Sequence, residues 1–133
     1  MAFRIPRPDT AFSTAPTGKR PRQHSEKHLD FIRKLPCVVS GRRPVEAAHV
    51  SFASPLYAKR AAGMGEKADD RWVLPLSPAL HASQHNANER LWWEGTKIDP
   101  LALCAALWGV TGDIESAEII IKAHREKANC RTQ

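Results

Sequence analysis

The first regular pattern of apolar residues follows Ser25. Leu29, Ile32 and Leu35 recur at three-residue intervals, which is typical of one buried face of a helix. Ser25 suits a helix N-cap, because its hydroxyl can accept a hydrogen bond from a backbone N–H of the first turn. Pro36 cannot continue a helix. The pattern therefore predicts a short helix that ends before Pro36.

Two short apolar runs then indicate extended structure. Residues 37–39 and 45–50 flank residues 40–44, which contain a glycine and a proline suited to a tight turn. This order predicts a β-hairpin with His49 on its second strand. Residues 51–71 form a connection longer than most in a compact domain, so we expect it to contribute to function.

Residues 73–76 form a further short extended piece that leads into a helix. Ser77 followed by Pro78 combines an N-cap side chain with proline at the first helical position. We expect this helix to run to about Arg90, and Gly95 to interrupt the helical pattern that follows.

Two more helices are predicted near the C-terminus. Asp99 and Pro100 repeat the cap-plus-proline signature, and Gly109 is the expected end of that helix. Asp113 opens the last helix, whose isoleucines and alanine form one apolar face and which we expect to fray near Asn129.

Composition indicates one folded domain with a basic arm. The chain has 133 residues, of which 42% are hydrophobic and 26% charged, as in a globular protein with a modest core. Residues 1–24 are rich in proline and basic residues and show almost no apolar periodicity, which predicts a flexible arm. We expect residues 25–133 to form a single domain.

Charge and apolar content narrow the partners and the compartment. The net charge is +6, which favours nucleic acid as a partner ahead of an acidic membrane surface. No stretch approaches the roughly 20 apolar residues of a membrane span, and no secretory signal is evident, so we expect a cytoplasmic protein without membrane contact. The three cysteines are far apart and are expected to be reduced thiols.

Two histidine pairs have the spacing of possible metal ligands. His81 and His85 are four residues apart on a predicted helix, so their imidazoles share one face and could hold one ion. His24 and His28 have the same spacing at the foot of the arm, so spacing alone is weak evidence, and polar surface histidines are the alternative for either pair. Only the later pair follows a hairpin that carries His49.

Residues 36–50 (PCVVSGRRPVEAAHV) look like the hairpin of HNH nucleases, and residues 73–85 (VLPLSPALHASQH) resemble their metal-binding helix. Residues 63–67 (GMGEK) with 69–72 (DDRW) are similar to a phage- and prophage-associated branch, the group around recombination-enhancement-function nucleases and small prophage endodeoxyribonucleases. The resemblance covers residues 36 to about 108.

The resemblance implies an α+β fold with a ββα-metal core, also called the HNH or His-Me finger. A β-hairpin and a metal-binding helix would form this core over residues 36–90, with further helices over 91–128. The implied activity is metal-dependent hydrolysis of DNA phosphodiesters by a one-metal mechanism. His49 would be the general base, and His81 and His85 would bind Mg²⁺ or Mn²⁺, with Zn²⁺ as the alternative.

Two protein ligands are few for such an ion, so a third is expected. Asp70 is the first candidate, because it belongs to the resembling segment and a carboxylate suits Mg²⁺ or Mn²⁺. Glu46 is the second candidate. Asp70 could instead orient His49 by a hydrogen bond to its other ring nitrogen.

The chain departs from the family pattern at three places. Many HNH proteins hold a structural zinc with four cysteines, and the matching positions here are Cys37, Ser40, Ser77 and Leu80, so we expect no such zinc. Ala48 stands where many members place a metal ligand. The middle Asn of the family name has Trp72 or Asp70 as its nearest occupant.

Arg42, Arg43 and Lys67 are candidate DNA-contacting residues, because they lie near the site in sequence order; a solvated basic surface is the alternative. Trp92 and Trp93 could stack on unpaired bases, but we expect at least one of them in the core, since neighbours on a helix face different ways. A phage or host recombination protein is a further candidate partner.

Two other functions compete: a nucleic-acid-binding module with a degenerate, inactive site, and an accessory protein with structural zinc on the helix histidines.

Overall fold

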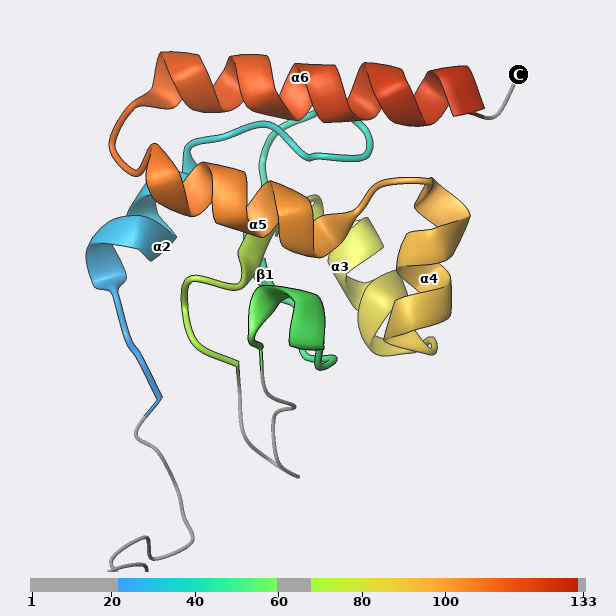
Figure 1. The fold of residues 1–133 in the computed structure, drawn as a ribbon. Helices are drawn as coiled ribbons and strands as arrows, with labels where there is room; N and C mark the ends of the chain where they lie inside the picture. Colours follow the sequence, from blue (N-terminus) through green and yellow to red (C-terminus); the bar gives the residue numbers. More distant parts are fainter. Residues whose placement is uncertain (1–21, 60–67, 132–133) are drawn as a thin grey trace, which may run out of the picture.

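A pair of antiparallel strands forms the centre of the structure, a computed structural model that describes residues 22–59 and 68–131. β1 (Glu46–His49) pairs with β2 (Val73–Leu76), with Glu46 opposite Leu76 and His49 opposite Val73. The described fold is α+β, as expected, because several helices pack around this single pair (Figure 1).

The helices lie on several sides of the strand pair (Figure 1). In Figure 1, α5 lies alongside α6 across the top, and α3 and α4 lie together to the right of β1. None of the helices in the described ranges is long and apolar enough to cross a membrane. The elements outside the strand pair are α2 (Glu26–Arg33), the short 3₁₀ helix η1 (Pro55–Tyr57), α3 (Pro78–His85), α4 (Glu89–Thr96), α5 (Pro100–Gly109) and α6 (Ile114–Arg131).

The hairpin predicted over residues 37–50 was wrong in its first strand. Residues 38–40 form a turn, in which the Gly41 N–H donates to the Cys37 carbonyl at 2.8 Å. β1 pairs instead with β2, across the long connection, so His49 ends the first strand of the pair and not the second. The fully buried β2 offers an apolar partner that a local pattern could not reveal.

The single helix predicted from Pro78 to Arg90 is two helices. α3 ends at His85, and the side chain of Asn88 accepts a hydrogen bond from the Leu91 N–H at 3.2 Å as the N-cap of α4. Asparagine favours caps over helix interiors, because its side chain competes for backbone hydrogen bonds. Gly95, expected to interrupt a helix, lies within α4.

The remaining helix predictions were confirmed. The Ser25 hydroxyl caps α2 through the His28 N–H, and the Asp99 carboxylate caps α5. α6 follows Asp113, although it continues past the expected fraying point at Asn129 to the end of the described range.

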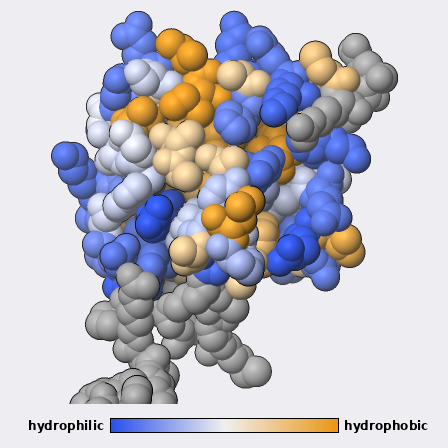
Figure 2. Space-filling view, viewed as in Figure 1, coloured by the Kyte–Doolittle hydropathy of each residue, from blue (hydrophilic) through white to orange (hydrophobic). Residues whose placement is uncertain are grey.

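The core lies between the strand pair and helices α2, α5 and α6. Trp93 is 1% exposed and belongs to it, whereas Trp92 is only partly buried, which confirms that one of the two is a core residue. The face drawn in Figure 2 is largely hydrophilic, and apolar groups gather over the region of α5 and α6. The largest aliphatic side chains that are fully buried are Ile32, Leu35, Leu74, Leu76, Leu103, Leu107 and Ile121.

Candidate active site

His49 and Asp70 form a hydrogen-bonded pair at the end of β1. Nε2 of His49 lies 2.9 Å from Oδ1 of Asp70, and the Asp70 side chain is fully buried. His49 keeps a partly exposed ring, since its side chain is 17% accessible. The carboxylate therefore orients a histidine that solvent can still reach.

The N-terminal segment 22–25 holds Asp70 in place. Nη2 of Arg22 donates to Oδ1 at 2.6 Å, and the Ser25 N–H donates to Oδ2 at 2.8 Å. The Asp70 N–H donates in turn to the Gln23 carbonyl at 2.9 Å. Residues 22–24, which were assigned to the arm, thus lie against residues 68–70; residues 1–21 of that arm are outside the described ranges.

Asp70 stays ionised in this environment. Burial acts to raise the pKa of its carboxyl, but the hydrogen bonds from His49 and the Ser25 N–H and the charge of Arg22 outweigh burial and lower the pKa. An ionised carboxylate can hold a proton on the ring nitrogen that faces it and can stabilise an imidazolium.

Arg22 and His24 are members of this cluster that sequence reasoning missed. Nη2 of Arg22 lies 3.4 Å from Nε2 of His49, and Nδ1 of His24 lies 2.7 Å from Oδ2 of Asp70. No spacing or motif links residues 22–24 to residue 70, because the contact depends on how the two segments pair in the fold.

A second cluster lies at the other end of β1. Nδ1 of His81 is 2.9 Å from Oε1 of Glu46, and the rings of His81 and His85 are 4.7 Å apart between centroids. Glu46 begins β1 and His49 ends it, so their Cα atoms are about 10 Å apart. Asp70 thus accompanies His49, whereas Glu46 accompanies the helix histidines.

The donor chemistry of the second cluster fits a divalent ion, since two imidazoles and one carboxylate are common ligands. Within residues 22–59 and 68–131, however, no three His, Cys, Asp or Glu side chains already converge as a ligand set. The Glu46 carboxylate binds the His81 ring, so an ion would have to take the place of that hydrogen bond.

Helix α3 also fixes the end of β1, through Gln84. The buried side-chain amide of Gln84 donates to the His49 carbonyl at 3.4 Å and to Glu89 at 3.5 Å. Glu89 accepts hydrogen bonds from the N–H groups of Ser51 at 2.6 Å and Phe52 at 3.3 Å. These contacts join the strand that carries His49 to α3 and α4.

Backbone N–H groups hydrogen-bond to the thiol of Cys37, the position that the sequence resemblance matched to a zinc-binding cysteine of HNH proteins. The Ser40 N–H donates to Sγ of Cys37 at 3.4 Å. Burial acts to raise the pKa of Cys37, but hydrogen bonds from Ser40, Ser77 and Val39 outweigh burial and lower it. Ser77 itself caps α3 by accepting from the Leu80 N–H at 3.4 Å.

The other positions singled out from the sequence take no part in the side-chain contacts of the two clusters given above, or lie outside the described ranges. Arg42 is exposed, and Arg43 pairs with Glu118 at 2.7 Å. Ala48 and Trp72 are buried in the core. Lys67, the third candidate DNA contact, lies outside the described residues.

One family matches the chain: it is described as "Protein of unknown function (DUF968)", and the match spans residues 5–106. This range contains every residue of the two clusters. No curated protein and no solved structure matches the chain.

Proposed function

We propose that this chain, which belongs to the DUF968 family, is a metal-dependent endonuclease that hydrolyses phosphodiester bonds of DNA. The observation that carries the proposal is the pair of His49 and buried Asp70 at the end of β1. An imidazole oriented by a carboxylate is well suited to act as a general base near neutral pH. The order of β1, β2 and α3 agrees with a ββα-metal core and supports the same proposal.

In this proposal His49 takes a proton from the attacking water. Asp70 fixes which ring nitrogen carries the existing proton and stabilises the imidazolium that forms. Arg22 lies 3.4 Å from the His49 ring and is partly exposed, so its guanidinium can bind an oxygen of the phosphate that reaches His49.

Glu46, His81 and His85 would hold the divalent ion, Mg²⁺ or Mn²⁺ before Zn²⁺. We assign Glu46 in preference to Asp70, because Asp70 already accepts hydrogen bonds from Arg22 and Ser25 and faces His49. When bound, such an ion supplies positive charge to the phosphate and to the leaving oxygen.

A DNA-binding module without activity is the second candidate. Two observations favour it: Ala48 is fully buried where many HNH proteins place a metal ligand, and the described residues hold no preformed set of three ligands. Such a module would bind DNA and leave it intact.

The test is cleavage of supercoiled plasmid and of a single-stranded oligonucleotide with Mg²⁺, Mn²⁺ or Zn²⁺. We expect the wild type to cleave DNA and His49→Ala to lose at least about 100-fold in rate. His124→Ala is the matched control, since His124 is a half-buried histidine on α6, and it should keep wild-type activity. Intact DNA at micromolar wild-type protein with every ion would contradict the endonuclease, and binding without cleavage would support the second candidate.

A further inference from the structure

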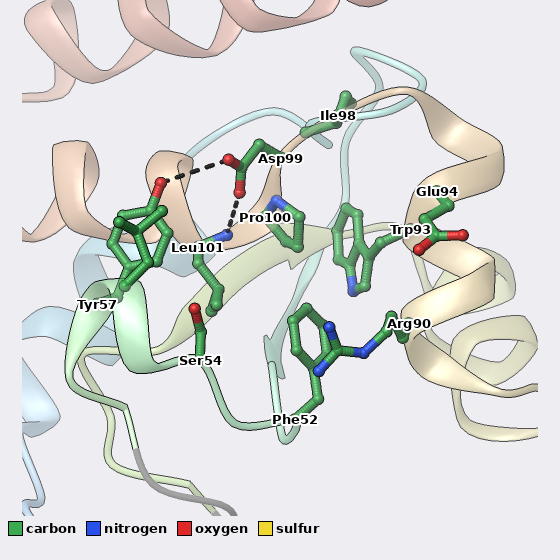
Figure 3. A pocket seen from close by; sticks show the side chains of 11 residues that line it. Phe52, Ser54, Tyr57, Arg90, Trp93, Glu94, Ile98, Asp99, Pro100 and Leu101 are labelled. Carbon is green, nitrogen blue, oxygen red and sulfur yellow. Dashed lines mark hydrogen bonds between the residues drawn. The ribbon is translucent and has the colours of Figure 1, made fainter.

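A cavity of about 300 Å³ opens beside η1, between this short helix and helices α4 and α5 (Figure 3). This volume is at the lower end of the range for sites that bind small ligands or parts of larger ones. Its walls combine aromatic rings, a cation and carboxylates. Among the residues that line it are Phe52, Leu56, Tyr57, Arg90, Trp93 and Asp99.

Trp93, one of the residues that line this cavity, carries a buried hydrogen-bond donor that the described residues leave unused. Its side chain is 1% exposed, and Nε1 has no hydrogen-bond partner in the part of the chain that the structure describes. Figure 3 shows the indole nitrogen on the side of the ring that faces Phe52 and Arg90. Buried donors without partners are rare in folded proteins, so this N–H points to a ligand that brings an acceptor.

The other walls supply flat apolar surface and positive charge. The Arg90 guanidinium lies 4.8 Å from the Phe52 ring and donates to the Ala53 carbonyl at 3.2 Å. The Tyr57 hydroxyl donates to Asp99 at 3.3 Å, which fixes a second ring at the cavity. Leu56 is 84% exposed, so apolar surface also reaches solvent at this wall.

The cavity lies close to His49 along the chain. Phe52 is three residues after His49, so their Cα atoms are at most about 11 Å apart. Glu89 binds the N–H groups of Ser51 and Phe52, and α4, which Glu89 begins, also carries Arg90 and Trp93. The wall of the cavity and the end of β1 are therefore held by the same contacts.

We infer that this cavity receives an unpaired nucleobase of the DNA strand bound at His49. This inference rests on the proposed function for the identity of the ligand. A base offers a flat face that stacks on aromatic rings and an edge with carbonyl or ring-nitrogen acceptors for the Trp93 N–H. Arg90 at the rim is placed to bind the backbone phosphate of the same nucleotide.

The test measures binding of a fluorescently labelled twelve-nucleotide thymidine strand by anisotropy, in the His49→Ala background and without divalent metal, so that nothing is cut. An abasic strand of the same length, with sugar and phosphate only, is the second probe. We expect the abasic strand to bind about 10-fold more weakly or worse than the thymidine strand. Trp93→Phe keeps a ring and removes the N–H, and should weaken only thymidine-strand binding, by about 3- to 10-fold.

Trp92→Phe is the matched control. Nε1 of Trp92 donates to the Ser83 hydroxyl at 3.0 Å, and Trp92 does not line the cavity, so this variant should bind both strands as the parent does. If Trp93→Phe fails to fold, the ratio of thymidine-strand to abasic-strand affinity in the parent decides whether a base is bound. Arg90→Ala, at an exposed position, should weaken the binding of both strands about fivefold, because both keep the phosphates.

Two results would overturn the base pocket: equal affinity for thymidine and abasic strands, or unchanged affinity in both Trp93→Phe and Arg90→Ala. Absence of any strand binding would overturn it as well. If the protein with an intact His49 binds the thymidine strand more tightly than the abasic strand but does not cleave DNA, only the endonuclease proposal is contradicted. If that protein cleaves DNA but binds both strands equally, only the base pocket is contradicted.

Discussion

His24 and His49 share one carboxylate, because Nδ1 of His24 lies 2.7 Å from Oδ2 of Asp70 and Nε2 of His49 lies 2.9 Å from Oδ1. The two histidines differ in their surroundings. The His24 side chain is 56% exposed, whereas that of His49 is 17% exposed and extends from the end of a strand. We expect the effect of each substitution to follow this difference.

Asp70→Asn should lower the rate of DNA cleavage by about 10- to 100-fold, because an amide no longer orients His49 or stabilises its protonated form. His24→Gln should change the rate by less than about threefold, since an exposed histidine is easily replaced by water. Initial rates of plasmid nicking, with circular dichroism to verify folding, measure both. Equal losses in the two variants would contradict the role assigned to Asp70.

Acid should destabilise the protein through His28. His28 is fully buried, and burial lowers its pKa from 6.5 to about 4, although the charge of Asp70 opposes this effect. The unfolded chain therefore binds a proton at a higher pH than the folded chain. The stabilisation is complete above pH 6.5 and is lost as the pH falls toward 4, by a total of about 3 kcal/mol.

Urea unfolding of wild type and His28→Gln between pH 7 and 4 measures this loss. The Gln variant cannot take up the proton, so its free energy of unfolding should fall less over this range. Its stability at pH 7 reports separately on the lost contact between Nδ1 of His28 and the Thr111 hydroxyl, which are 2.8 Å apart. Parallel profiles for the two proteins would rule out His28 as the cause.

Gly41→Ala should destabilise the fold by about 1–3 kcal/mol. Gly41 has a φ of +74°, and a Cβ there would lie 2.6 Å from Nη1 of Arg125 on α6. Gly95→Ala is the matched control, because a Cβ at this helical position would meet no described atom within 4 Å beyond its chain neighbours and the backbone of its own helix. This second change should stabilise α4 by about 0.5–1 kcal/mol, so thermal unfolding should shift in opposite directions for the two variants.

Binding of Mn²⁺, measured by calorimetry, separates the two candidate carboxylate ligands. Glu46→Gln should weaken binding by about 10-fold or more, because the carboxylate beside His81 is lost. Asp70→Asn should leave the affinity within about threefold of the wild type, since Asp70 lies with His49. If Asp70→Asn weakened Mn²⁺ binding more than Glu46→Gln, Asp70 would be the carboxylate ligand instead of Glu46.

The sequence was sufficient for the helix starts at Ser25 and Asp99, which depend on neighbouring residues, although the equally local cap at Asn88 was not predicted. Ser25 and Asp99 cap their helices through N–H groups two or three residues ahead, so each start could be predicted from a few letters. The pairing of β1 with β2 joins segments separated by the long connection. The local apolar run Cys37–Val39 resembled a partner strand for β1, but the structure pairs β1 with β2 instead.

The difference between local and long-range contacts also explains what could be predicted of the candidate site. His49, Asp70, Glu46 and the helix histidines were all named from sequence, but their grouping was not, since Asp70 had two equally consistent roles. Arg22 could not be predicted at all, because its contact with Asp70 depends on residues 22–25 lying along residues 68–70.

The hydrogen-bonded thiol of Cys37 bears on how a chelator experiment should be interpreted. In a protein whose turn is held by zinc, removing the metal unfolds the chain, so activity is lost whether or not a metal takes part in catalysis. Here the turn is held by N–H donors to sulfur and by backbone contacts, such as the Val38 N–H with the Pro75 carbonyl at 3.0 Å. EDTA should therefore stop DNA cleavage without altering the circular dichroism spectrum, and re-addition of Mn²⁺ should restore cleavage without a refolding step.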